Sequence, residues 1–335
     1  MGRFSAARES SPVELRSPPV APARQLRPSG APASSTRTAG VLALQRTAGN
    51  AATSALLHGD ASRGGPQTAQ VQRAAVADFM ATDPSRVTDA QLDGTDEFKA
   101  YLASSTPAKK VSPDDARLAL RLLLRYLNQL PPGTMFGPHD LDGWLRTAQA
   151  RSKVAGTAEG AVGSGEWVAL SPADVRGPTT SGSDFMQWML GGGSVPAVKT
   201  AKGNCWEMVM FSAYRAGQLT EARMREIYTK GQAADKARGG LAFPETVEAE
   251  LRAGTEYVYD PAKAGSPRPL RGDVVIFQSA AGHVSLATGR LVGGQVEIVS
   301  HWGPPHNNPK IETTTIEDLL KSGAGKPVKF WSPRW

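Results

Sequence analysis

The sequence predicts an α+β protein in which a helix packs on an antiparallel sheet, preceded by a helical region and a disordered basic tail. Three observations support this prediction. Residues 1–73 are rich in Pro, Ser and Arg, residues 74–175 carry leucines at helical spacing, and residues 176–335 combine one apolar helix with short apolar runs between turn residues. A chain of 335 residues with 40% hydrophobic content is large enough for two folded units and a tail.

The segment 1–73 contains nine Arg, three acidic residues and no Lys, so it carries +6 of the formal net charge of +7. Its composition, poor in large apolar residues, is typical of disorder. Within it, VLALQRTAGNAATSALL (41–57) places Leu and Ala at helical spacing, which predicts a short amphipathic helix suited to a partner's groove. The tail shows neither aromatic interleaving nor a folded basic module, which argues against nucleic-acid binding.

The chain has no apolar run of about 18 residues, so we expect no membrane span. Its first residues, MGRFSAARESSPVELRSPP, lack the apolar stretch of a secretion signal. We therefore expect synthesis in the cytoplasm and export, where it occurs, by another route. The one cysteine excludes an intramolecular disulfide and fits a reducing compartment.

In the predicted helical subdomain 74–175, Ser112 followed by a proline and two aspartates is a strong helix start. A leucine-rich helix follows and stops at Pro131, and a second helix is expected to begin at Asp140. The glycine-rich stretch 155–167 lacks a phosphate-binding lysine at the needed position and predicts a linker.

The predicted domain 176–335 begins with a short helix at 183–190 and continues with GNCWEMVMFSAYRAG (203–217). Asn204 is a preferred N-cap and Glu207 completes a capping box, so Cys205 occupies the first helical position. The positive end of a helix dipole favours the thiolate, which is the nucleophilic form of cysteine. We therefore expect a reactive thiol on a buried helix. The alternative is a small buried hydrophobic residue.

Downstream, RGDVVIF (271–277), GHVSLATG (282–289) and VEIVSH (296–301) predict strands, and PVKFWSPRW predicts a closing strand after a helix capped by Thr315. A hairpin centred near residue 292 pairs His283 with His301. Such a pair supplies a base and its orienting partner for a thiol. A slip of one residue in the register would separate the two histidines.

One Cys and two His also suffice for a catalytic zinc site. Close-spaced ligand pairs such as H-x-x-x-H or C-x-x-C are absent from the sequence, so we expect neither a metal nor another cofactor.

The segment GNCW with the helix that follows it, and the order of Cys before a His on a strand, resemble the papain-like cysteine peptidase superfamily. GDVVIF before GHVSLATG is similar to the NlpC-type members of that superfamily, which cleave amide bonds in cell-wall peptides. The resemblance covers roughly residues 183–335. It implies a papain-like catalytic domain with Cys205 as nucleophile, His283 as general base and His301 as orienting residue. The chain departs from the family in lacking a glutamine just upstream of Cys205, so a second oxyanion donor is unassigned.

Further residues complete the predicted site. Trp206 and Trp302, beside Cys205 and His301, are candidate cleft walls together with Asn204, and core packing is the alternative for both tryptophans. His306, Asn307 and Asn308 in the loop after His301 are backup candidates for the third catalytic position.

The segment LQRTAGNAA within 41–57 resembles a segment near the N-termini of proteins associated with bacterial extracellular contractile injection systems. The resemblance implies that components of such a particle are partners, and that the chain is a cargo delivered by it, with an immunity protein as a further partner. The first functional hypothesis is a thiol-dependent amide hydrolase: a peptidase acting on protein, an amidase acting on peptidoglycan peptides, a deamidase or an acyl transferase. The second is a non-enzymatic accessory or binding protein of the particle, and the third is a metal-dependent hydrolase.

Overall fold

The structure, a computed structural model, describes residues 75–106, 109–131, 141–169, 182–238, 242–277, 282–303 and 308–335. The chain divides into two units, Met1–Arg63 and Gly64–Trp335, and all of the described residues belong to the second. The tail 1–73 and its predicted helix 41–57 lie outside the described residues. The fold described below is that of the second unit.

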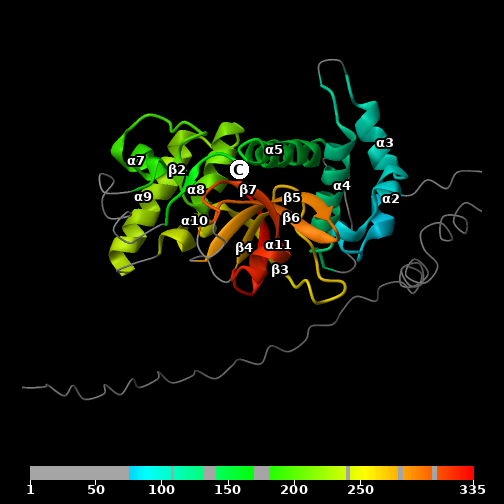
Figure 1. Ribbon diagram of the computed structural model, residues 1–335. Helices are drawn as coiled ribbons and strands as arrows, with labels where there is room; N and C mark the ends of the chain where they lie inside the picture. Colours follow the sequence, from blue (N-terminus) through cyan, green and yellow to red (C-terminus); the bar gives the residue numbers. More distant parts are fainter. Residues whose placement is uncertain are drawn as a thin grey trace, which may run out of the picture. The chain divides into compact units, whose positions relative to one another are not determined.

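This unit is mixed α+β, as predicted, and its largest sheet is antiparallel throughout (Figure 1). The six strands lie in the order β3-β8-β4-β5-β6-β7. They comprise β3 (Arg252–Tyr259), β4 (Val274–Phe277), β5 (His283–Val292), β6 (Gln295–Ser300), β7 (Glu312–Thr315) and β8 (Val328–Pro333). Two short parallel strands, β1 (Glu166–Trp167) and β2 (Lys202–Gly203), form a separate pair. The predicted strands at 274–277 and 283–289 and the predicted closing strand are confirmed.

Apart from α11, the helices form two groups, one toward the right and one toward the left of Figure 1, and α5 runs above the sheet between them. The first group comprises η1 (Val76–Phe79), η2 (Pro84–Arg86), α2 (Asp89–Asp93), α3 (Asp96–Ala103), α4 (Pro113–Leu127) and α5 (Leu141–Glu159). The second comprises α7 (Asp184–Gly191), α8 (Cys205–Arg215), α9 (Glu221–Arg238) and α10 (Phe243–Leu251), and α11 (Ile316–Lys321) lies between β7 and β8 in the chain. The domain boundary predicted at 175/176 falls outside the described residues and stays a prediction.

The helix starts follow from capping side chains. Ser112 Oγ accepts a hydrogen bond from the Asp115 amide at 3.1 Å, and Thr315 Oγ1 accepts one from the Asp318 amide at 3.1 Å. These two caps confirm the predicted starts of α4 and α11. The prediction of a linker over residues 155–167 is wrong at its beginning, because residues 155–159 continue α5. There Val154, Ala155 and Ala158 are buried, and the packing of this small-residue face outweighs the glycine pattern.

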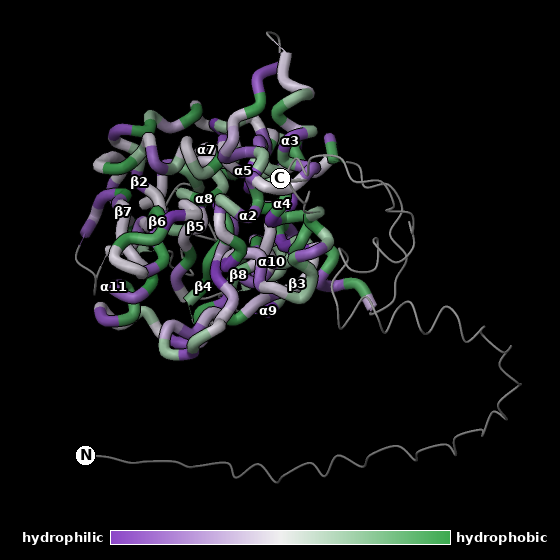
Figure 2. The backbone as a smooth tube through the Cα atoms, turned by 90° about the vertical axis from the view of Figure 1, so that its right-hand side faces the viewer, coloured by the Kyte–Doolittle hydropathy of each residue, from purple (hydrophilic) through white to green (hydrophobic). Residues whose placement is uncertain are grey.

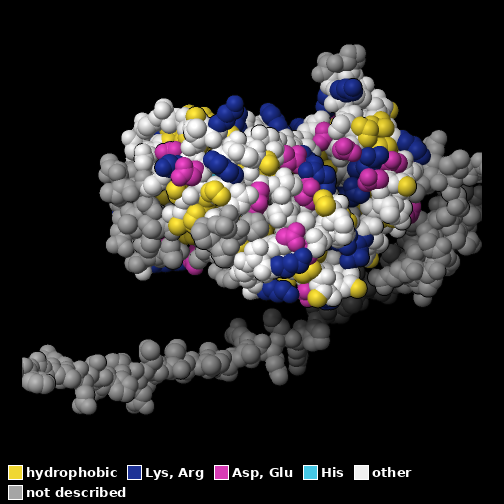
Figure 3. All heavy atoms as spheres, in the orientation of Figure 1, with side chains coloured by type: hydrophobic (Ala, Val, Ile, Leu, Met, Phe, Trp, Pro, Cys, Tyr) yellow, Lys and Arg dark blue, Asp and Glu magenta, His cyan; other side chains and the backbone are white. Residues whose placement is uncertain are grey.

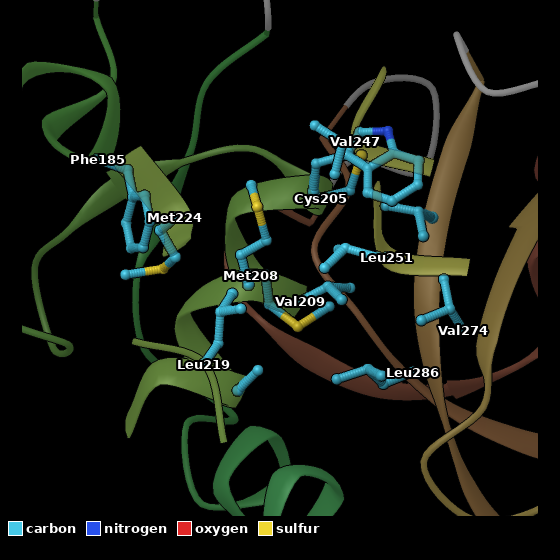
Figure 4. Close-up of a cluster of buried hydrophobic side chains, with 14 of the residues drawn as sticks. Phe185, Cys205, Met208, Val209, Leu219, Met224, Val247, Leu251, Val274 and Leu286 are labelled. Atoms are coloured by element: carbon cyan, nitrogen blue, oxygen red, sulfur yellow. The ribbon is translucent and has the colours of Figure 1, made fainter. Parts of the chain in front are cut away.

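The two faces of the sheet pack against different helices. Val274, Ile276, Val284 and Leu286 share one apolar cluster with α8 and with the end of α5, and Cys205 belongs to this cluster (Figure 4). The alternate residues of β4 and β5, including Val275, Phe277 and Ala287, pack with α11 in another cluster. Because strand side chains alternate, neighbouring residues of β5 point to different helices.

The β5–β6 register differs from the predicted one. The turn is Gly293-Gly294, both at positive φ, and Val292 pairs with Gln295. A bulge follows, so that Ser285 pairs with Ser300. Gly289 lies in the bulge at φ +79°, where a Cβ would come within 2.8 Å of Arg271 Cβ. The predicted pairing of His283 with His301 is therefore wrong by one residue: extending the observed register places Trp302 opposite His283.

A buried ion cluster joins the first group of helices to the sheet. Asp273, just before β4, accepts hydrogen bonds from Arg125 of α4 at 2.8 and 3.0 Å and from Arg151 of α5. The Leu270 amide donates a further bond at 2.6 Å. Burial alone would raise the pKa of Asp273, but the two guanidinium groups outweigh it and hold that pKa below its ordinary value.

We expect Asp273→Ala to lower the free energy of unfolding by about 3–5 kcal/mol, because it leaves two buried guanidinium groups without their carboxylate. Urea unfolding of the full chain measures the change. The control is Asp114→Ala, which removes an exposed partner of Arg117 and should change the value by at most about 1 kcal/mol. Equal losses in the two variants would contradict a special role for the cluster.

Candidate active site

The site is built on the first turn of α8. Asn204 Oδ1 accepts a hydrogen bond from the Glu207 amide at 3.1 Å, and the Asn204 amide donates to Glu207 Oε2 at 2.9 Å. The capping box predicted from the sequence is thus confirmed, with Cys205 as the first helical residue. The box fixes the direction of α8 and the position of the sulfur.

Glu207 also connects α8 to two other helices. Its carboxylate accepts hydrogen bonds from Ser183 Oγ, the cap of α7, at 2.8 Å, and from the Tyr228 hydroxyl of α9 at 3.1 Å. The same Ser183 Oγ accepts a bond from the Met186 amide at 3.0 Å. Burial and the neighbouring carboxylate raise the pKa of Tyr228 well above its ordinary value. One buried carboxylate therefore joins the starts of α7 and α8 to the middle of α9.

The thiol of Cys205 lies where α8 meets the beginning of β5. The nearby backbone N–H groups of Val284, Trp206 and Cys205 itself lower the pKa of the thiol. Burial opposes them more strongly and, with a smaller contribution from Glu207, raises the pKa of Cys205 to about 11. The side chain is only 9% exposed. The expectation that the helix start favours the thiolate is therefore wrong for the resting protein, because desolvation outweighs the helix amides.

His283 is the first residue of β5 and is buried. Its Nε2 lies 2.8 Å from Ser300 Oγ and 3.0 Å from Ser285 Oγ. Its ring is stacked on Trp302, with centroids 4.9 Å apart and planes 20° apart, and its centroid lies 5.5 Å from that of Phe277. Phe277 belongs to the side of the sheet that packs against α11, so the imidazole of His283 lies on that side. The next residue, Val284, faces α8, and its backbone N–H is near the sulfur of Cys205.

His301 lies on the α8 side instead. Its Nε2 lies 3.2 Å from the Pro309 carbonyl oxygen, and the Asn204 carbonyl is a second acceptor near the ring, so the neutral imidazole, with one N–H, donates to one of the two. It also lines a small apolar cavity of about 40 Å³ together with Gly203, Glu207 and Met208. Burial lowers the pKa of His301 to about 4 despite the two carbonyls. Its assignment as the orienting residue stays a prediction, but in the structure its ring is turned toward backbone carbonyls.

The structure thus gathers Cys205, His283 and His301 at one end of β5 and β6, with the two imidazoles on opposite sides of the sheet. The thiol makes no hydrogen bond to either ring within the described residues. On the face in Figure 3 no histidine is visible, which agrees with the burial of both rings.

The remaining predicted residues fall into three groups. Trp206 is buried in the α8 core, which favours core packing over a cleft wall, whereas Trp302 covers the imidazole of His283. Asn204 acts as the helix cap and its carbonyl contacts His301. His306 and Asn307 lie outside the described residues, and Asn308 Nδ2 donates to Glu312 at 2.6 Å.

Sequence reasoning missed Ser285 and Ser300, the two hydroxyl partners of His283. The signal that could have found them is Gly289, because a glycine within a strand suggests a bulge. A bulge at that position shifts the register and brings Ser300, rather than His301, to the side of the sheet that carries the His283 ring.

Within the described ranges, no cluster of three or more His, Cys, Asp or Glu side chains has the arrangement of a metal site. None of the helices described is both long and apolar enough to cross a bilayer. In Figure 2 hydrophilic and hydrophobic stretches are interleaved along the tube.

Comparison of the chain with protein-family models, with curated proteins and with solved structures finds no match.

We expect the free energy of unfolding to fall by about 2 kcal/mol between about pH 7 and pH 5 through His301 alone. With its pKa lowered to about 4, the folded ring stays neutral while the unfolded ring, with a pKa near 6.5, takes up a proton. Urea unfolding at the two pH values measures the fall. His301→Gln should remove this component, and an equally steep fall in that variant would contradict it.

Proposed function

We propose that the chain is a thiol-dependent amide hydrolase with a papain-like catalytic domain, in which Cys205 is the nucleophile and His283 the base. The observation that carries the proposal is the position of Cys205 as the first residue of α8, with three backbone N–H groups nearby that lower the pKa of its thiol. One of them belongs to Val284, the residue directly after His283. Nucleophile and base thus lie on elements that meet at one point.

The proposed chemistry begins with transfer of the thiol proton to His283. Because Ser285 and Ser300 contact Nε2, Nδ1 is the nitrogen that receives this proton, once the ring carries its own proton on Nε2. The thiolate then attacks the amide carbonyl carbon and forms the C–S bond. The imidazolium returns the proton to the leaving amine as the C–N bond breaks, and water hydrolyses the thioester. The candidate substrates are a protein, a glutamine side chain and a peptidoglycan peptide. A glutamine side chain would release ammonia, whereas the other two would release a fragment with a new amino group.

The fold supports a papain-like arrangement in its main features. A cysteine-bearing helix packs on an antiparallel sheet, and the histidine begins a strand of that sheet. A polar partner for the imidazole comes from the next strand, as the resemblance implies, although it is Ser300 rather than His301. The extra helices α9 and α10 occupy the long separation between Cys205 and His283.

The second candidate function is a binding module of an injection particle that uses the same fold without catalysis. The buried, protonated state of Cys205, with a pKa of about 11, favours it. In this alternative Cys205 is a packing residue and the hydrogen bonds of His283 serve only stability.

To separate the two functions, the full-length protein is incubated with an unfolded protein, a glutamine peptide and peptidoglycan peptides, and released amine or ammonia is measured. We expect hydrolysis of one of them, with a loss of at least about 100-fold in Cys205→Ala and in His283→Gln. The matched control is Ser212→Ala, a buried change farther along α8, which should retain activity. Turnover that survives Cys205→Ala would refute the thiol mechanism.

We also propose that the segment 41–57 loads the chain into a contractile injection particle as cargo made in the cytoplasm of a bacterium. Deleting residues 1–60 should abolish co-sedimentation with such particles while leaving hydrolysis by the remaining chain unchanged. Loading that persists after the deletion would assign recognition to another part of the chain.

A further inference from the structure

Two serine hydroxyl groups contact the same nitrogen, Nε2, of His283. Ser285 and Ser300 are directly paired across β5 and β6, both are fully buried, and both hydroxyl oxygens lie within 3.0 Å of the same ring nitrogen. A hydroxyl group donates or accepts, so these contacts alone allow Nε2 to be either protonated or unprotonated.

The hydroxyl hydrogens distinguish the two possibilities. Within the described residues, His283 Nε2 is the one hydrogen-bond acceptor available to either hydroxyl. A proton on Nε2 would leave both hydroxyl hydrogens buried and unsatisfied, which is a costly and rare arrangement. An unprotonated Nε2 offers its lone pair to both of them.

We propose that Ser285 and Ser300 are positioning residues that hold the resting imidazole of His283 as its Nδ1–H tautomer, with the lone pair on Nε2. Trp302 and Phe277, against the ring, restrict the rotation that would exchange the positions of the two nitrogens. The tautomer is therefore fixed by the protein and not by solvent.

This inference rests on the proposed function only in its consequence for the thiol. A ring that already carries a proton on Nδ1 does not accept one there from Cys205. Activation then requires the proton to move to Nε2, together with rotation of the serine hydroxyls. In the resting protein the thiol then keeps its own proton, in agreement with the raised pKa of Cys205.

The test is a long-range ¹H–¹⁵N correlation spectrum of the full-length protein labelled with ¹⁵N-histidine at neutral pH. The chain contains five histidines, and His283→Gln identifies the signal by its loss. We expect His283 to show an unprotonated Nε2 and a protonated Nδ1. The reverse pattern, or a doubly protonated ring, would overturn the proposal.

The role of the serines is tested with the Ser285→Ala and Ser300→Ala double variant. Each substitution removes one hydroxyl group from a buried position and adds no larger side chain. Removal of both donors should lower the ratio of Nδ1–H to Nε2–H tautomer by about tenfold or more. Restoring a hydroxyl as Ser300→Thr, with Ser285 intact, should retain the wild-type pattern, and Ser212→Ala is the control. An unchanged ratio in the double variant would refute the role of the serines.

Because the spectrum needs no substrate, its outcome is independent of hydrolysis. The expected tautomer in a protein that hydrolyses nothing would refute the proposed function and leave this inference standing. Hydrolysis by a protein whose resting His283 carries its proton on Nε2 would refute the inference alone.

Discussion

The buried carboxylate of Asp273 is the interaction on which the arrangement of the fold depends. It binds Arg125 of α4 and Arg151 of α5 at the beginning of β4, where charged groups without partners would be strongly unfavourable. The strand that follows pairs with β5, and α5 packs against α8. The ion cluster thus fixes the sheet and the helix layer that together place Cys205 beside the start of β5. Among the helices around Cys205, the carboxylate of Glu207 joins α7, α8 and α9 by hydrogen bonds.

At Cys205 two general effects act in opposite directions. Backbone N–H groups at a helix start favour a thiolate, whereas removal of the sulfur from water disfavours any charge. Burial is the larger effect here and raises the pKa of the thiol to about 11. The buried carboxylate of Glu207, needed to cap α8, adds to it. The same features that position the nucleophile therefore keep it neutral, so the proposed reaction depends on a base at His283 rather than on a free thiolate.

Much of the fold was predictable because local chemistry determined it. The caps at Ser112, Asn204 and Thr315 and the apolar run at 274–277 were identified correctly from the sequence. The hairpin register was not, because it depends on a bulge at Gly289, where the close approach of Arg271 leaves no room for a side chain. That one error exchanged Ser300 for His301 as the partner of His283. The ion cluster of Asp273 could not be predicted either, since Asp273 lies more than 100 positions along the chain from both Arg125 and Arg151.

The central claim, that His283 serves Cys205 as a base, is tested most directly by the rate of iodoacetamide alkylation against pH, read by intact mass. The chain has one cysteine, so the signal has a single source. Our account predicts that alkylation near neutral pH is at least about tenfold slower in His283→Gln than in the wild type, since a thiol with so high a pKa has almost no thiolate of its own. Identical profiles in the two proteins, rising only in strongly alkaline solution, would contradict the account and favour a binding module.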